Sequence, residues 1–239
     1  MQLSNKIYCD SLFETIKLQN CVFANMYEDY PYLIIEDFFS QELCKQIVDS
    51  LQSKQNGIKA KVKSTTTSGI VIPDLKEKYR KTNILKLEKQ LQKLYDEKFL
   101  HIQPKIEEFF KVPLTFSTKL QVLEYKEGFF YTKHSDDSSE LIDEMGQTVG
   151  FVNVAPNRKL TTVLFGTSFS DTTTDPYHFS GGELIFNYLY NEDQKQIKLK
   201  PKAGTMLVFP SNPIFSHEVA KVISGYRLTM VQWHDVLLN

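Results

Sequence analysis

The second half of the chain is divided into short stretches in which apolar and polar residues alternate. Turn-forming residues separate these stretches, as at 126–128 (Lys-Glu-Gly) and 191–193 (Asn-Glu-Asp). Alternation with a period of two indicates half-buried strands, and about seven short strands with such turns are typical of a β-sandwich or a double-sheet jelly roll. We therefore expect strands at 116–125, 129–134, 160–165, 182–189, 195–200, 204–209 and 226–233.

The first half of the chain has a different pattern, which favours helices. An apolar run at 32–39 predicts a strand, and Ser40 is then a candidate N-cap for a helix. A second helix is expected over 87–110, with Pro104 splitting or kinking it. Residues 58–80 are rich in Lys, Thr and Ser, which predicts an exposed loop with short strands.

These patterns predict one domain with a short extension before it. A length of 239 residues suits a single domain. We expect residues 1–30 to form an N-terminal extension and residues 31–239 to form the domain. Within the domain, helical support would come from 31–111 and a jelly-roll core from 112–239. The expected fold class is mainly β with flanking helices (α+β).

Composition and charge argue against several classes of protein. Lys and Arg total 28 against 29 Asp and Glu, so the chain lacks the basic excess of a nucleic-acid or membrane-surface binder. Three cysteines (Cys9, Cys21 and Cys44) without a C-x-x-C pair argue against a disulfide framework and a structural zinc site. No signal-peptide pattern and no membrane-length apolar stretch occurs. We therefore expect a soluble, cytoplasmic protein.

His134 and Asp136 are the first candidate ligands of a metal ion. Residues i and i+2 of an extended segment point to the same face, so this imidazole and this carboxylate would emerge side by side. A second imidazole would complete the 2-His-1-carboxylate set of non-haem iron(II) oxygenases, which leaves positions open for a cosubstrate and O2. On its own, H-x-D is a weak signal that occurs in many proteins by chance.

His217 and Arg227 strengthen that interpretation. His217 follows a predicted strand and a turn, and Arg227 lies on the last clear strand. An arginine inside a small β fold is costly unless it meets an anion, and its planar guanidinium matches a carboxylate in bidentate fashion. Thr229 would share the face of Arg227.

Five motifs in a fixed order extend these observations. They are Y-x-x-G-x-x-Y-x-x-H-x-D at 125–136, R-x-x-T at 158–161, Gly-Gly-Glu-Leu at 181–184, Lys-Ala-Gly at 202–204 and H-x-V-x-x-V-x-x-G-x-R at 217–227. In this order they resemble the catalytic domain of the prolyl 4-hydroxylase-like iron(II)/2-oxoglutarate-dependent dioxygenases, over roughly residues 30–236. The resemblance implies a double-stranded β-helix (jelly-roll) core, which agrees with the strand pattern.

The resemblance also implies a role for each candidate residue. His134, Asp136 and His217 would bind Fe(II), and Arg227 would pair with the far carboxylate of the cosubstrate 2-oxoglutarate. Tyr125 would line the cosubstrate pocket, O2 would be the second cosubstrate, and ascorbate is a candidate accessory.

One position departs from the family. Phe165 stands where many relatives have a tyrosine whose hydroxyl donates a hydrogen bond. We hypothesise that Thr229 supplies the missing contact to the cosubstrate.

The implied reaction is hydroxylation of an unactivated C–H bond, and the carboxylate of Asp136 argues against halogenation. The favoured substrate is a prolyl or other amino-acid residue in a peptide or protein, and the alternative is a free amino acid or small metabolite. A nucleic-acid demethylase is disfavoured, because Trp233 stands where such relatives carry a second arginine. A non-catalytic jelly-roll binding module and a cupin-like metal hydrolase are the alternatives of other classes. The oligomeric state stays open.

The remaining histidines and the polar segments have simpler interpretations. His101 is interpreted as a surface or packing residue and His178 as a loop residue, and His234 is not expected to be a ligand. The polar segments 56–80, 137–157 and 168–180 are expected to be long loops beside the site, at least one of them mobile without substrate.

Overall fold

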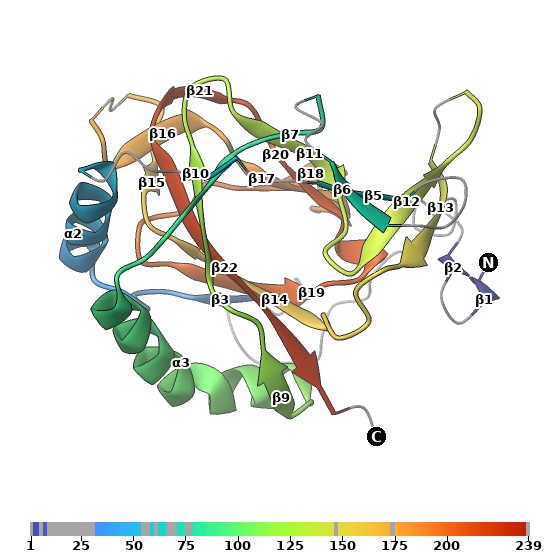
Figure 1. Cartoon of the computed structure of the whole chain (residues 1–239), viewed down its shortest axis with the longest axis horizontal. Coiled ribbons are helices and arrows are strands. Elements are labelled where there is room, and N and C mark those ends of the chain that lie inside the picture. Colours follow the sequence, from blue (N-terminus) through green and yellow to red (C-terminus); the bar gives the residue numbers. More distant parts are fainter. Residues whose placement is uncertain are drawn as a thin grey trace.

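The computed structural model describes residues 32–53, 78–145, 148–172 and 175–237. It also describes the backbone of five short strands outside these ranges: β1 (Gln2–Ser4), β2 (Ile7–Tyr8), β4 (Ile58–Lys59), β5 (Val62–Thr65) and β6 (Val71–Asp74). Two helices flank a largely antiparallel β core (Figure 1). Most of the predicted extension 1–30, as well as Cys9 and Cys21, lies outside the described residues.

The larger sheet has eight strands in the order β3-β19-β14-β22-β10-β8-β4, with β9 also paired to β22. Its centre is the β14–β22 pair, which is buried on both faces. The strands not yet bounded are β3 (Leu33–Ile35), β8 (Asn83–Leu85), β9 (Leu114–Ser117), β10 (Gln121–Tyr125), β14 (Leu160–Phe165), β19 (Met206–Pro210) and β22 (Arg227–Val236).

The smaller sheet has five strands in the order β18-β17-β20-β11-β7, and a three-stranded sheet, β15-β16-β21, follows beside it. Together with the larger sheet they form the expected double-stranded β-helix, so the predicted fold class is confirmed. The bounds are β7 (Arg80–Lys81), β11 (Phe130–His134), β15 (Ser168–Phe169), β16 (His178–Gly181), β17 (Leu184–Tyr190), β18 (Gln196–Leu199), β20 (His217–Val219) and β21 (Val222–Gly225). A 3-10 turn, η1 (Pro213–Phe215), precedes β20.

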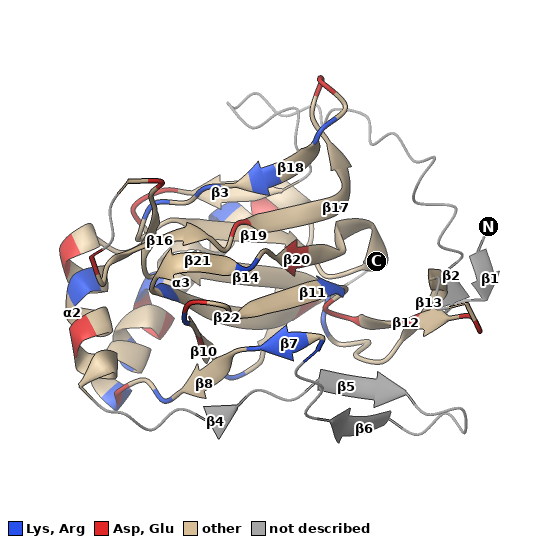
Figure 2. Cartoon of the chain, turned by 90° about the horizontal axis from the view of Figure 1, so that it is seen from above, with Lys and Arg blue, Asp and Glu red and all other residues tan. Residues whose placement is uncertain are grey.

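The helices begin close to where the sequence predicts. Helix α2 (Gln41–Gln52) is capped by Ser40, whose hydroxyl accepts a hydrogen bond from the Leu43 N–H at 3.2 Å. Helix α3 (Lys89–Phe110) runs through Pro104, so of the two expected effects the split is wrong and the kink stays a prediction. A proline leaves the carbonyl four residues earlier without a partner, and that residue, Leu100, lies on the exposed side of the helix where water can satisfy it. Figure 2 shows charged residues of both signs along α2.

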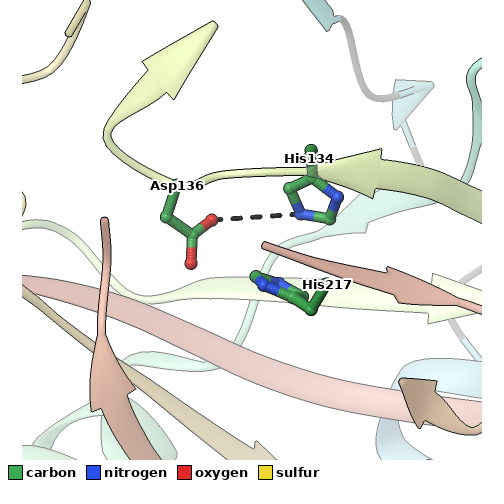
Figure 3. A group of neighbouring side chains, drawn as sticks. All are labelled: His134, Asp136 and His217. Atoms are coloured by element: carbon green, nitrogen blue, oxygen red, sulfur yellow. Dashed lines mark ion pairs between the residues drawn. The ribbon is translucent and has the colours of Figure 1, made fainter. Parts of the chain in front are cut away.

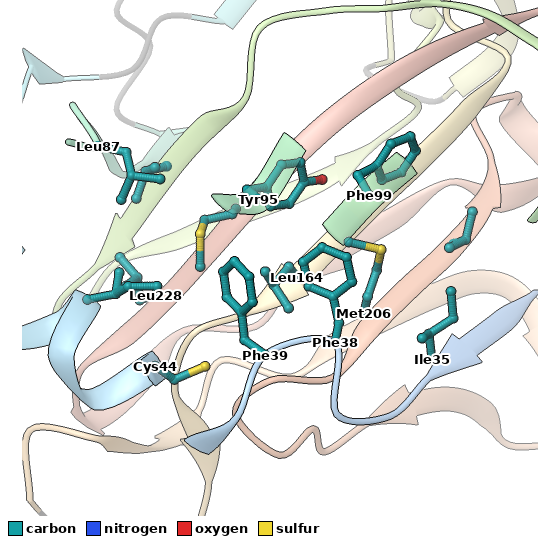
Figure 4. Close-up of a cluster of buried hydrophobic side chains, with 14 of the residues drawn as sticks. Ile35, Phe38, Phe39, Cys44, Leu87, Tyr95, Phe99, Leu164, Met206 and Leu228 are labelled. Atoms are coloured by element: carbon teal, nitrogen blue, oxygen red, sulfur yellow. The ribbon is translucent and has the colours of Figure 1, made fainter. Parts of the chain in front are cut away.

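The hydrophobic core has two layers, one on each face of the larger sheet. The helix-facing layer packs Phe39, Tyr95 and Phe99 against Leu164 and Met206 of the sheet (Figure 4). The inter-sheet layer fills the space between the larger and smaller sheets with aromatic and aliphatic side chains. Because both faces of the larger sheet are covered, every residue of β14 is buried.

Two further expectations from the sequence, for the segments 137–157 and 32–39, are wrong. The segment 137–157 is not simply a loop: it contains the hairpin of β12 (Ser138–Ile142) and β13 (Thr148–Asn153), and the backbone of β2 pairs with β13. The expected strand at 32–39 is only three residues long, because the chain turns at Asp37, where φ is +53°. Within the described residues, neither helix could span a membrane. The mobility of a loop beside the site stays a prediction.

Candidate active site

Two neighbouring strands bring the predicted metal ligands together. His134 ends β11 and His217 begins β20, and the two residues are paired across these antiparallel strands. Their ring centroids lie 4.3 Å apart. Asp136 follows in the turn after β11, and its Oδ1 lies 4.0 Å from His134 Nε2 (Figure 3). One ligand atom from each of the three residues lies within 4.8 Å of the others.

Backbone carbonyls fix the orientation of both imidazoles. His134 Nδ1 lies 2.9 Å from the Thr132 carbonyl, and His217 Nδ1 lies 3.0 Å from the Phe215 carbonyl. A carbonyl can only accept, so each Nδ1 carries a proton, and in the neutral form of the ring the lone pair is then on Nε2. Neutral imidazoles held in this way are the usual histidine ligands of metal ions.

The electrostatics also suit a cation. Burial, with the neighbouring His217, lowers the pKa of His134 to about 3, so this imidazole is neutral near pH 7. Burial alone would raise the pKa of Asp136, but the two imidazoles, the Thr161 hydroxyl and Arg158 hold it below its ordinary value. The site therefore offers two imidazole nitrogens, of which that of His134 is neutral, and one carboxylate.

Arg227 is a buried cation that forms no ion pair within the described residues, although the charge of Glu183 favours its protonated form. Its side chain is 1% exposed, its Nε has no hydrogen-bond partner, and no described carboxylate forms an ion pair with it. The guanidinium lies over the ring of Tyr125, 4.8 Å from the centroid, and near the rings of Phe165 and Phe179. Burial lowers its pKa to about 10, which still leaves it charged at pH 7. Such a group fits an anionic ligand that enters the space between the sheets.

The family comparison agrees with this geometry. Residues 120–235 match the family described as the 2OG-Fe(II) oxygenase superfamily. The chain carries a 2OG-Fe(II) oxygenase domain. The family implies Fe(II), 2-oxoglutarate and O2. The donor atoms of His134, Asp136 and His217 (the triad) fit Fe(II), and the buried guanidinium of Arg227, whose Nε has no partner, fits 2-oxoglutarate. None of the curated proteins matches the oxygenase.

Solved structures show the same fold. A prolyl-4-hydroxylase from Pseudomonas putida is 17% identical, with a TM-score of 0.55 over 87% of this chain and 94% of that chain. A Trichoplax adhaerens prolyl hydroxylase, in complex with a peptide fragment of the hypoxia inducible factor oxygen degradation domain, is 17% identical, with a TM-score of 0.56 over 88% and 86%. The viral collagen prolyl hydroxylase of Paramecium Bursaria Chlorella virus-1, in its 2OG complex, is 19% identical, with a TM-score of 0.55 over 89% and 100%.

The two remaining cosubstrate candidates of the oxygenase lie beside Arg227. Tyr125 is 2% exposed and is paired with Arg227 across β10 and β22. Thr229 is 1% exposed, shares the face of Arg227 on β22, and is paired with Phe165 of β14. The role of Thr229 as a substitute for a missing tyrosine hydroxyl stays a prediction.

Gly182 makes room for the aliphatic part of the Arg227 side chain. Gly182 has φ +64°, and a Cβ at this position would come within 3.0 Å of both Arg227 Cδ and Val222 Cγ2. The sequence suggests only a tight turn at Gly181-Gly182, because the close approach of Arg227 depends on a strand far along the chain.

The contacts that Tyr131 and Arg158 make with His134 and Asp136 were not predicted from the sequence. Tyr131 stacks on the His134 ring at a centroid distance of 3.5 Å. Arg158 donates to the Asp136 main-chain oxygen at 3.0 Å, and its guanidinium lies 3.9 Å from the ring centroid of Trp233. Tyr131 and Arg158 belong to sequence motifs, but those motifs carry no information on contacts across strands.

The other histidines stay apart from the triad. His101 is exposed on α3. His178 is the first residue of β16 rather than a loop residue, and its Nδ1 lies 2.6 Å from Asp175 Oδ1. His234 is fully buried, with Nδ1 2.8 Å from Ser117 Oγ. None of the three joins the one group of possible metal ligands found among the described residues.

Proposed function

We propose that the oxygenase binds Fe(II) through His134 Nε2, His217 Nε2 and one carboxylate oxygen of Asp136. The observation that carries this proposal is the convergence of three ligand atoms whose two imidazoles have Nδ1 blocked by backbone carbonyls. Three protein ligands leave room for a chelating cosubstrate and O2, as in the facial triad of iron oxygenases. A closed structural metal site would need a fourth protein ligand.

Arg227 is proposed to hold the far carboxylate of 2-oxoglutarate. A buried guanidinium is stabilised when a carboxylate accepts two of its N–H groups in the same plane. Tyr125 would form one wall of this pocket, and Thr229 would offer a hydroxyl from the next inward-facing position of β22. A cupin-like hydrolase or a non-catalytic module would have no use for this buried cation.

The reaction proposed is hydroxylation of an unactivated C–H bond. When bound, iron with O2 and 2-oxoglutarate supplies the oxidising power, and 2-oxoglutarate leaves as succinate and CO2. The chain's own residues orient the ligands and exclude water. Burial keeps the His134 imidazole neutral, and the aromatic rings around Arg227 would help to exclude water from the cosubstrate.

We further propose a prolyl or other amino-acid residue within a peptide or protein as the substrate. Trp233 lies on the same face of β22 as Arg227, and the guanidinium of Arg158 stacks on it beside Asp136. An indole and a guanidinium offer flat surfaces for an aliphatic ring and donors for a peptide carbonyl. The three relatives named above are prolyl hydroxylases, and one is bound to a peptide.

A free amino acid or a small metabolite is the second candidate, because the triad and Arg227 would serve either kind of substrate. The proposed catalytic domain is 31–239, with 1–30 as an extension. A cytoplasmic location stays a prediction.

A peptide library tests the substrate class. The oxygenase is incubated with Fe(II), 2-oxoglutarate, O2 and ascorbate, together with peptides that each contain a central proline or, as controls, alanine. Mass spectrometry should find one added oxygen atom on proline peptides, accompanied by succinate, and neither with Asp136→Ala. Oxidation of free proline or another metabolite alone would favour the second candidate. Succinate formation that no peptide or metabolite stimulates would contradict the hydroxylase proposal.

A further inference from the structure

A pair of buried hydroxyl groups stands behind the carboxylate of Asp136. Thr161 Oγ1 donates to Asp136 Oδ2 at 2.7 Å, and Ser211 Oγ lies 2.8 Å from the same Thr161 Oγ1. Thr161 is 0% exposed and Ser211 is 1% exposed. Thr161 lies on β14, and Ser211 directly follows β19, so the two groups come from paired strands.

The direction of these hydrogen bonds is fixed by chemistry. An ionised carboxylate can only accept, so the single proton of the Thr161 hydroxyl points to Asp136 Oδ2. Thr161 Oγ1 must then accept the proton of Ser211. The result is a polarised chain, Ser211 to Thr161 to Asp136, in which each bond strengthens the next.

The far end of this chain is anchored to the backbone around the site. The Ser211 N–H donates to the Lys159 carbonyl at 2.9 Å. The Ser211 carbonyl accepts from the Asp137 N–H at 3.1 Å and lies 3.0 Å from Ser135 Oγ. Ser135 and Asp137, the neighbours of Asp136 in the sequence, are therefore both hydrogen-bonded to Ser211, which orients Thr161.

We propose that Thr161, oriented by Ser211, is a positioning residue that holds Asp136 Oδ2 away from the metal and leaves Oδ1 as the single ligand oxygen. Oδ1 is the oxygen that lies 4.0 Å from His134 Nε2. A carboxylate that binds the metal through one oxygen leaves more coordination positions open than a carboxylate that binds through both. This inference rests on the proposed role of the triad as metal ligands.

Thr162 supplies a matched control. It is the next residue of the same strand, it is also 0% exposed, and its side chain points to the opposite face. There its Oγ1 lies 3.0 Å from His234 Nε2 and donates to the Gln232 carbonyl at 3.2 Å. Thr161→Val and Thr162→Val therefore remove the same group at the same depth, but only the first lies beside a proposed ligand.

The test is titration of the full chain with Co(II) under anaerobic conditions, followed by calorimetry and by the visible spectrum of the bound ion. Loss of a partner behind a metal ligand typically weakens metal affinity by about 10–100-fold, which is the effect expected for Thr161→Val. Thr161→Ser should restore affinity to within about threefold, and Ser211→Ala should show a smaller loss of the same kind. Thr162→Val should bind Co(II) like the wild type although its thermal stability falls.

Each outcome decides the inference. Wild-type affinity in Thr161→Val, or an equal loss in Thr162→Val, would overturn it while the proposed function stands. If Thr161→Val does not fold, wild-type affinity in Ser211→Ala overturns it and a weakened affinity supports it. If the wild-type protein itself binds no Co(II), the proposed metal site fails and the inference fails with it.

Discussion

The two faces of strands β14 and β22 are equally buried, but the polar side chains on them differ in whether they have hydrogen-bond partners. On the face toward α3, His234 has both ring nitrogens within 3.0 Å of hydroxyl groups, from Ser117 and Thr162, and its ring stacks on Phe99. On the face toward the smaller sheet, Arg227 is buried with its Nε unpaired.

The same contrast separates two histidines, the half-buried His134 and the fully buried His234. Burial lowers the pKa of both His134 and His234 to about 3, so charge state does not tell them apart. What differs is the second ring nitrogen: in His234 it meets a hydroxyl, whereas in His134 it is the ligand atom proposed for the metal. A buried polar side chain whose donor and acceptor atoms all have partners is structural. One with a donor or acceptor atom left without a protein partner is a candidate for function.

The largest effect should come from Arg227→Met, which removes the unpaired cation. Truncating one partner of a buried charge pair costs about 2–5 kcal/mol, so 2-oxoglutarate should bind the Co(II)-loaded protein roughly 30-fold to several thousand-fold more weakly. The ligand-free protein should become more resistant to denaturant, because an uncompensated buried charge is gone. Calorimetry and denaturant unfolding measure the two effects. Unchanged affinity for 2-oxoglutarate would remove Arg227 from the cosubstrate site.

The next largest effect should be structural and confined to the helix-facing side. His234→Ala should lower the free energy of unfolding by about 2–5 kcal/mol, because it removes a buried ring that packs on Phe99. Its affinity for Co(II) should equal that of the wild type. His134→Ala, the matched variant of the other face, should lose Co(II) binding instead. A loss of metal affinity in folded His234→Ala would mean that the two faces are coupled.

The smallest effect should be the pH dependence of stability. The folded-state pKa of His234 is about 3, below the ordinary value of 6.5. As the pH falls, the unfolded chain binds the proton first, so stability present above pH 6.5 is lost progressively toward pH 3. Between pH 7 and pH 5, His234 should account for about 2 kcal/mol of this loss. Denaturant unfolding of ligand-free His234→Phe should show a pH dependence weaker by that amount, and an unchanged slope would contradict the assignment.

Much of the fold could be predicted because its strands have one-sided patterns or strong apolar runs. The predicted strands at 129–134, 160–165 and 204–209 correspond closely to β11, β14 and β19. The hairpin of β12 and β13 escaped prediction, because Ser138, Ser139 and Glu140 give β12 no alternation of apolar and polar residues. Its pairing depends on the partner strand rather than on its own sequence.

The site was predictable at the level of residue types and order, and less so in its supporting contacts. The spacing of His134 and Asp136 places them on one face, and the later His217 joins them through the pairing of β11 and β20. The Thr161 hydroxyl reaches Asp136 from 25 residues away. Such a contact depends on strand register, which a single sequence does not determine.

The most direct test of this account is the anaerobic visible absorption of the protein with Fe(II) and 2-oxoglutarate. Chelation of the iron by the keto acid gives a visible charge-transfer band. The band should appear with the wild type, vanish with His134→Ala, and require far more 2-oxoglutarate with Arg227→Ala. A folded wild-type protein that binds Fe(II) but gives no band would contradict the proposed assignment of the triad and of Arg227.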